Sequence, residues 1–555
     1  MRRLLFLITG VLCAVGANAE ELVNTKVPSF PTKSYFRRML EPVPTRVDLK
    51  PPVKLRDYIV DGKLELSMRS FLDLVMANNT DIEIQRLSVE TSRNQILRAS
   101  GIFDPLLFAS FSTTRTESPA SDALAGATAV NSLSQPTLFR WSQLTSTGAT
   151  YNASFSGAKS STNSSFQLFN PSLTTGLNFN FAQPLIRGRG SFITKLPITI
   201  AKSRLLGAQY NIEDQVLQLV TAADSAYWDV VQARESVRVQ EQALALADQS
   251  LKRSQRELEL GAISPLDIYQ PQAVYANAEI QLTQARFRLA LVEDTLRKQV
   301  GADLDPDIRK LPIVLTENIA PPTDTVMDKE GLVNKALQMR PDLKSARQAL
   351  DVDALNLRGT KDALRPNLSL TGQYGATGRG GPFSQKTNIF NGDGTSNSIV
   401  SVIPGGIGDS LDQLFGFGFP VYGFGLTLNL PIRDRRASAD YADAVVNQRL
   451  DALRVRSTEQ SVRLSVLNAI NQVENNKAGV DLAKVALDLA QKRADAEQKK
   501  YDLGTTTIFF LLDAQTALTQ AQSNLVNQSV NYRKALSTLQ RFTGELLSER
   551  GIAIK

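Results

Sequence analysis

The sequence predicts an α+β membrane protein: long coiled-coil helices that form an elongated α-helical barrel, joined to a membrane β-barrel that is shared by a trimer. Three observations predict it. The chain contains an internal two-fold duplication, it carries sustained seven-residue repeats, and it has segments of about ten residues in which apolar and polar side chains alternate. The expected barrel has twelve strands, four from each chain.

The duplication is visible as two matching segments. Residues 261–301 align with residues 504–544 without a gap, and each segment opens with a helix-stop glycine, Gly261 or Gly504. Further landmarks match upstream in the same order, namely Pro105 with Pro366 and Pro184 with Pro431. Landmarks repeated about 250 residues apart indicate two copies of one unit, not a solenoid of short repeats.

The domain boundaries follow from this duplication and from composition. Residues 1–19 have a charged start, a short apolar core and an Ala-x-Ala site, which predicts a secretory signal peptide. The alternative is an N-terminal anchor, but the apolar run is shorter than the roughly 20 residues that a spanning helix needs. The rest divides into a proline-rich arm (20–60), repeat 1 as helix-strand-strand-long helix-helix (61–310), a linker (311–326), repeat 2 (327–545) and a C-terminal tail (546–555).

Composition excludes many functions. The chain has no histidine, and its one cysteine, Cys13, lies in the predicted signal peptide. Disulfides, thiol nucleophiles, histidine acid-base catalysis and most zinc sites are therefore excluded. The formal net charge of +7 is modest for this length and does not indicate nucleic-acid binding. We expect no enzyme activity, no catalytic residue, no cofactor and no metal.

The long helices carry the clearest pattern. Apolar residues recur every seven positions, with small or polar residues three positions later. A strict seven-residue repeat predicts supercoiling around neighbouring helices. The helix expected over 193–260 would be roughly 100 Å long, which requires an elongated bundle or tube. An ordinary dimeric coiled coil is the alternative. The repeating apolar positions are Ala223, Val230, Val237, Leu244, Leu251 and Leu258, and in the second copy Val466, Val473, Val480, Leu487, Ala494 and Tyr501.

Two segments, 173–181 and 422–430, alternate strictly between apolar and small or polar residues. This is the pattern of membrane-barrel strands, although half-buried strands of a soluble sandwich would show it too. Weaker partner strands follow Pro105 and Pro366, and an aromatic girdle is expected at Phe415, Phe417, Phe419 and Tyr422. The residues expected to face lipid are Leu177, Phe179, Phe181, Phe424, Leu426 and Leu428.

The number of strands that cross the membrane in each copy must be even. Both helices that flank the strands of one copy should lie on the same side of the membrane, so the strands between them are even in number. We assign the strand-like run 148–157 to an external loop, and expect further external loops over 117–146 and 378–414, which leaves four crossings per chain. Four strands cannot close a membrane barrel, so several chains must share it. Two chains would enclose only side chains, whereas three would leave a conducting pore.

The ordered motifs resemble the TolC family of outer-membrane efflux proteins over about residues 64–545. The resemblance rests on the duplication itself and on several short segments. These are residues 77–81 and 339–342 before a helix, residues 183–190 after a strand, and the turns at 261–267 and 501–504. The resemblance implies a homotrimeric exit duct of a tripartite efflux or type I secretion system, which passes small molecules or proteins outward. Its implied partners are outer-membrane lipid, a periplasmic adaptor (membrane fusion) protein and an inner-membrane RND, ABC or MFS pump.

The resemblance also implies that the two glycine turns lie near a periplasmic entrance, where a Tyr-x-x-Gly-x-Arg stretch and later aspartates close the tunnel. Tyr501, Gly504, Asp267 and Asp513 match this pattern, whereas Thr506 replaces the arginine and Phe510 replaces an aspartate. We therefore expect a different closure. One hypothesis is an apolar constriction formed by Ile508, Phe509 and Phe510, and a second hypothesis packs these three residues between helices. The two aspartates either line the pore or serve helix starts.

Two other functions compete with the duct. A periplasmic coiled-coil adaptor or scaffold would share the signal peptide and the heptads, but it would lack pairs of amphipathic strands. A carboxylate-based enzyme such as a glycosidase needs a concave catalytic domain, for which the heptads leave no obvious place.

Overall fold

The computed structural model describes residues 53–552 apart from 121–124, 126, 166, 318–327 and 387–398, together with residues 30, 32, 33 and 35. The predicted signal peptide and most of the predicted arm and linker lie outside these residues. Within the described part, the predicted linker contains the short strand β8 (Ile313–Leu315), which pairs in parallel with β2 (Lys63–Leu66).

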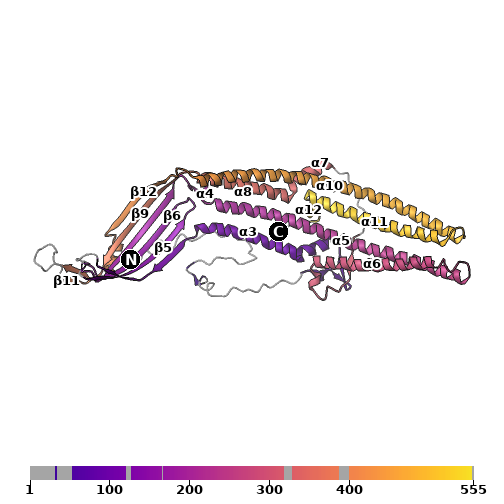
Figure 1. Cartoon of the computed structure of the whole chain (residues 1–555), viewed down its shortest axis with the longest axis horizontal. Helices are drawn as coiled ribbons and strands as arrows, with labels where there is room; N and C mark the ends of the chain where they lie inside the picture. Colours follow the sequence, from indigo (N-terminus) through magenta and orange to yellow (C-terminus); the bar gives the residue numbers. More distant parts are fainter. Residues whose placement is uncertain are drawn as a thin grey trace.

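The molecule is elongated, with one β-sheet at one end and long helices that run away from it (Figure 1). The first copy contains α2 (Met68–Asn78), α3 (Thr80–Ser100), β3 (Leu106–Phe111), β4 (Thr114–Pro119), β5 (Ala129–Leu144), β6 (Thr150–Thr162), β7 (Ser172–Pro184), α4 (Ser191–Thr194), α5 (Leu196–Glu259) and α6 (Tyr269–Gln299). The second contains α7 (Lys329–Met339), α8 (Pro341–Ala363), β9 (Asn367–Gly380), β10 (Phe383–Lys386), β11 (Ile399–Ile403), α9 (Ile407–Phe415), β12 (Pro420–Asn429), α10 (Arg435–Asp502) and α11 (Ile508–Thr543).

Local sequence signals explain where these helices begin. Asn79 caps α3 by accepting the backbone N–H groups of Asp81 and Ile82. Pro341 opens α8, because a proline at the first helical position gives up no hydrogen bond. Asp434 caps α10 by accepting the backbone N–H of Ala437 at 3.0 Å. These caps fix the points at which the chain leaves one element for the next.

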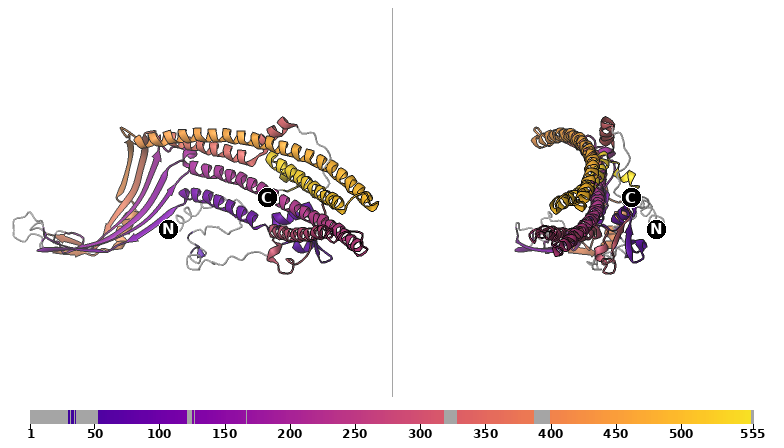
Figure 2. Two further views of the ribbon diagram at one scale, coloured as in Figure 1. Left: turned by 45° about the vertical axis from the view of Figure 1, so that its right-hand side comes forward. Right: turned by 90° about the vertical axis from the view of Figure 1, so that its right-hand side faces the viewer.

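The helices form a single curved layer (Figure 2). Nearest the sheet, neighbouring helices follow the order α10, α8, α5 and α3, and at the far end they follow the order α10, α11, α5 and α6 (Figure 1). The predicted seven-residue seam lies between them: Val230, Val466 and Val473 are fully buried, and Ala233 and Ala469 let the backbones approach. α5 has 64 residues and α10 has 68, so each is about 100 Å long.

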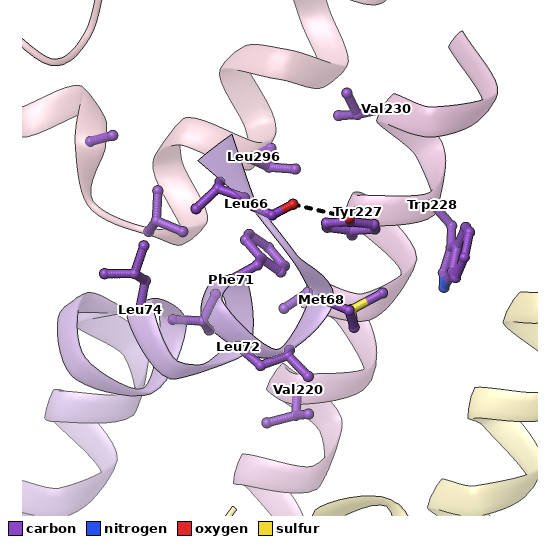
Figure 3. Packing of buried hydrophobic residues seen from close by; sticks show 14 of the residues in the cluster. Leu66, Met68, Phe71, Leu72, Leu74, Val220, Tyr227, Trp228, Val230 and Leu296 are labelled. Carbon is purple, nitrogen blue, oxygen red and sulfur yellow. Dashed lines mark hydrogen bonds between the residues drawn. The ribbon is translucent and has the colours of Figure 1, made fainter. Parts of the chain in front are cut away.

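The largest core lies midway along the helices. There α2 and a three-stranded sheet, in the order β1 (Ile59–Val60), β2 and β8, pack against the middle of α5 (Figure 3). Phe71 lies 5.6 Å from the Tyr227 ring, whose hydroxyl donates to the backbone carbonyl of Leu66 at 3.1 Å. Trp228 lies against the same cluster. This core braces the long helices from one side.

The main sheet has the order β12-β9-β7-β6-β5-β3, and β4 continues alongside β5 beyond the end of β3. All its pairings are antiparallel. The α+β class is confirmed. Among the described residues no helix combines the length and the apolar character needed to cross a membrane.

The expected strand count must be corrected. Six strands lie side by side in this sheet, not four. The run 148–157, assigned to an external loop, belongs to β6, which pairs along its length with both β5 and β7. Likewise β4 and β5 occupy most of 117–146, and 378–414 contains the end of β9 together with β10, β11 and α9. The parity argument itself holds, since four strands in one copy and two in the other are both even numbers.

Candidate functional site

The end of the molecule farthest from the sheet consists of two equivalent helix turns (Figure 1). Gly261 follows α5 with φ +70°, and Gly504 follows α10 with φ +71°. The next residue in each copy donates its backbone N–H back to the last helical turn, Ala262 to Glu257 at 2.8 Å and Thr505 to Lys500 at 2.9 Å. A left-handed residue at this position favours glycine, which has no Cβ to clash.

A group of polar side chains, here called the tip cluster, joins these two ends. It consists of Arg253 and Glu257 on α5 with Tyr501 and Asp502 on α10. The Tyr501 hydroxyl donates to Glu257 Oε2 at 2.6 Å. Arg253 donates Nε to Glu257 Oε1 at 3.0 Å and Nη1 to Asp502, while its guanidinium lies 4.5 Å from the centre of the Tyr501 ring. Each residue of the cluster therefore contacts at least one other.

The electrostatics of the tip cluster favour its present protonation state. Burial, followed by the hydrogen bond to Glu257, raises the pKa of Tyr501 to about 12. The hydrogen bond from Arg253 lowers the pKa of Asp502, and the same bond raises the pKa of Arg253. The tyrosine hydroxyl therefore remains a donor and the arginine–aspartate pair remains charged at neutral pH.

The structure separates the other predicted entrance residues. Asp267 accepts the Ser264 N–H at 3.2 Å, which closes the turn before α6, but it is not the N-cap of that helix. Asp513 lies within α11 and pairs with Arg493 of α10 at 2.6 Å, so it has no capping role. Thr506 lies in the turn that precedes α11 and contributes no side chain to the tip cluster.

Phe509 and Phe510 lie in the first turn of α11. Their rings form an edge-to-face pair with centroids 5.6 Å apart. Their exposed fractions are 54% and 52%, so in the single chain they are not packed between helices. They are available either to a neighbouring chain or to a water-filled interior.

Sequence reasoning identified Tyr501 but missed its partners. Position 506 lacks the expected arginine, and Arg253 supplies that charge from the other copy. The signal in the sequence was the i, i+4 pair of Arg253 and Glu257 in the last turns of α5. Nothing local in the sequence places this pair next to Tyr501.

At the opposite end, the register of the sheet tests the expected lipid face. Phe179 pairs with Tyr374, which pairs with Tyr422, while Phe181 shares its row with Phe424 through Gly372. Side chains in one row project to the same face. All six residues expected to face lipid belong to this face: Leu177, Phe179, Phe181, Phe424, Leu426 and Leu428. Of the expected aromatic girdle, the Phe417 ring stacks on that of Tyr374 at 6.0 Å.

Comparison with known proteins agrees with this architecture. The family described as outer membrane efflux protein matches residues 332–545. The outer membrane protein TolC of Vibrio cholerae is 26% identical over 374 residues, which cover 67% of this chain and 77% of that protein. The outer membrane efflux protein BepC of Brucella suis is 23% identical, covering 68% and 73%.

The fold is also that of solved structures. The CmeC outer membrane channel of Campylobacter jejuni matches with a TM-score of 0.61 and 15% identity over 91% of this chain and 95% of that chain. A membrane protein of Pseudomonas aeruginosa matches with a TM-score of 0.61 and 18% identity over 90% and 96%.

The chain resembles the TolC family of outer-membrane efflux proteins over most of its length, and its second copy matches that family. It is an exit duct of the outer membrane with a long periplasmic portion. The relatives that it matches are channel proteins.

Proposed function

We propose that three copies of this chain close into one duct, that a periplasmic adaptor and an inner-membrane pump deliver cargo to it, and that the tip cluster holds its entrance closed. The observation that carries the proposal concerns the edges of the single chain. Within the described residues, both the β-sheet and the helical layer end in elements that have a neighbour on one side only. At the sheet, the order of strands ends in β12 on one side and in β3 on the other. An open sheet edge in lipid is too costly, so a neighbouring chain must pair with each edge.

The helical layer has matching edges. α10 and α6 lie on opposite sides of it at the far end (Figure 1). Phe287 and Leu291, spaced i, i+4 on α6, are each 69% exposed, and α10 exposes Leu482, Val485 and Leu489 on its own seam. Apolar residues at this spacing are expected to face another helix, not water. Cyclic closure would bury the α6 seam of one chain against the α10 seam of the next.

The depth of the apolar face supports insertion of the sheet in a bilayer. On β12 this face runs from Pro420 to Leu428 through Tyr422, Phe424 and Leu426. Eight residue steps at about 3.3 Å span about 26 Å along the strand. At a tilt of about 40° the span across the membrane is roughly 20 Å, comparable with the apolar band of about 25 Å in such barrels.

The tip cluster would act inside each chain. It ties the end of the α5–α6 pair to the end of the α10–α11 pair through Tyr501–Glu257 and Arg253–Asp502. If the two pairs swing apart to widen the entrance, both contacts must break. An adaptor that binds the opened arrangement more tightly would shift the population toward it.

Relatives carry names that fit such an assembly. TtgC of Pseudomonas putida is called a probable efflux pump outer membrane protein. A periplasmic coiled-coil scaffold, the competing function, would not need a sheet with one continuous apolar face.

The test is native mass spectrometry of the detergent-extracted protein together with single-channel recording of the same sample. We expect three times the mass of the mature chain and a small conductance that is mostly closed. A Phe510→Ser variant, which removes one ring of the exposed pair, should raise the open conductance if the aromatic pair narrows the entrance. A monomer or dimer that is released without detergent and shows no conductance would overturn the proposal.

A further inference from the structure

The first copy contains an element that the second copy lacks. β9 and β12 pair directly, whereas β5 and β6 lie between their counterparts β3 and β7. We call β5, β6 and the turn 145–149 the inserted hairpin. Its strands have 16 and 13 residues, at least as long as the neighbouring strand β7 with 13.

We propose that the inserted hairpin crosses the outer membrane as part of the barrel wall, so that each chain contributes six strands and the trimer forms an eighteen-stranded barrel. The total of eighteen rests on the trimer proposed above, but the six strands per chain do not. The first support is the register. One row of directly paired residues runs unbroken across the sheet through the hairpin: Leu107, Trp141, Ala153, Phe179, Tyr374 and Tyr422.

The two faces of the hairpin match those of the strand beside it. On β6, Tyr151 and Phe155 share the apolar face with Phe181 and Leu177, their partners on β7. The other face of β6 carries Asn152, Ser154 and Ser156, which lie in rows with Asn180, Asn178 and Gly176. A lipid-facing strand must present this alternation in the same register as its neighbours, whereas an external loop has no such constraint.

The hairpin also spans the full height of the wall. Its turn lies at the helical end of the sheet, where the Thr147 carbonyl accepts the backbone N–H of Gly190 at 3.2 Å. Gly148 has φ +90°, and a Cβ there would lie 2.7 Å from the Gly188 carbonyl oxygen. On its other side, the hairpin donates from Gln143 to the Phe103 carbonyl at 3.2 Å. The turn is thus anchored between the entries to α4 and β3.

Simple geometry shows why six strands suit the helical layer. Four helices per chain at about 8–10 Å spacing occupy an arc of roughly 32–40 Å. Strands about 4.8 Å apart and tilted by about 40° occupy about 6.3 Å each along the circumference. Six strands therefore cover about 38 Å, which matches the helices, whereas four cover only about 25 Å.

The consequence is a wider exit. With the same spacing, eighteen strands give a backbone diameter of about 36 Å, and twelve give about 24 Å. Barrels of 16–18 strands leave a water-filled channel. The serine and asparagine side chains of β6, together with Arg140 of β5, would line this water. The barrel would then not limit the size of cargo, and a constriction would lie at the periplasmic entrance.

Single-cysteine labelling tests the proposal, because the mature chain contains no cysteine of its own. Ser154→Cys and Phe155→Cys would be labelled in lipid nanodiscs with a membrane-impermeant sulfonated maleimide. We expect Ser154→Cys to react at least about tenfold faster, because a charged reagent is excluded from the hydrocarbon that would cover position 155. Asn178→Cys and Phe179→Cys on β7 are the matched controls.

The outcomes separate the two proposals. If both hairpin cysteines react equally fast while the β7 pair still alternates, the hairpin lies outside the membrane and the inference is wrong, although the duct survives. If neither pair alternates, the sheet is not in the membrane and the proposed function fails as well. Counting strands by electron cryo-microscopy gives a second readout: six per chain supports the inference, and four per chain with a projecting hairpin overturns it.

Discussion

At the scale of single residues, the Tyr501 hydroxyl is the sharpest test of the closed entrance. Its hydrogen bond to Glu257 has a charged acceptor, and such bonds contribute about 1.5–3 kcal/mol. If the bond exists only in the closed state, Tyr501→Phe should raise the ratio of open to closed channels by about tenfold or more. Single-channel recording at neutral pH measures this ratio directly.

The matched control for that variant is Tyr275→Phe, which removes the same hydroxyl from the second turn of α6. It should leave the open probability unchanged. An equal effect of both variants would mean that the loss of a tyrosine hydroxyl loosens the helices in general and that the tip cluster has no special role.

The same tyrosine predicts a dependence on pH. Its pKa in the folded protein is raised from 10.0 to about 12, so the neutral form is favoured by folding. The stabilisation is therefore complete below pH 10 and is lost as the pH rises through 12, when the ionised oxygen can no longer donate. The difference in phenolate absorbance between the wild type and Tyr501→Phe should titrate near pH 12. A midpoint near pH 10 would show that the hydroxyl is free in solution.

At the scale of elements, the end of the chain is fixed to the middle of a long helix. Arg550 follows α12 (Leu546–Glu549) and donates to Asp224 of α5 at 3.0 Å. Asp224 is fully buried, and burial raises its pKa while the charge of Arg550 opposes that shift. The sequence alone predicts 546–555 only as a tail, because nothing near Arg550 in the sequence marks its partner.

Removal of this arginine should be costly. Arg550→Met would leave the Asp224 carboxylate buried without its main counter-charge, which we expect to destabilise the protein by about 3–5 kcal/mol. The double variant with Asp224→Leu should recover most of that loss, because an apolar pair replaces the buried ion pair. Denaturant midpoints for the two variants measure the difference, and equal midpoints would contradict a dominant role for the buried charge.

A feature of the structure could be predicted from the sequence when the residues that form it lie close together in the chain. The seam of α10 could be predicted because Val466, Val473 and Val480 repeat within one helix, and all three are buried. β5 was missed because Pro136 and Leu138 interrupt the polar face and Thr137 lies on the apolar one. Only its pairing with β6 reveals which residues share a face. The tip cluster was half predicted for the same reason, since Glu257 and Tyr501 are 244 positions apart.

At the scale of the whole molecule, one chain is an incomplete wall that continues in the same curved sense from β-sheet to helices (Figure 2). The two free sheet edges, β12 and β3, connect to α10 and α3, which are also the outermost helices nearest the sheet. One rotation can therefore close both layers at once. Such a head-to-tail contact closes into a ring when the rotation is an integral fraction of a turn.

If the chains close into a ring in this way, the exposed apolar seam of α6 is needed for assembly of the trimer but not for folding of the single chain. Phe287 is 69% exposed in the single chain, so Phe287→Lys should leave the helices of the monomer intact. In the assembly it would place a charge in the apolar contact between α6 and the α10 of the next chain, which costs several kcal/mol unless the charge is paired. Native mass spectrometry over a dilution series should show trimers dissociating at higher protein concentration than in the wild type. Leu304→Lys, in the 3-10 turn after α6 and 65% exposed, is the control that should assemble normally. If Phe287→Lys assembles as tightly as this control, the α6 seam faces water or another protein, and the helices of neighbouring chains meet elsewhere.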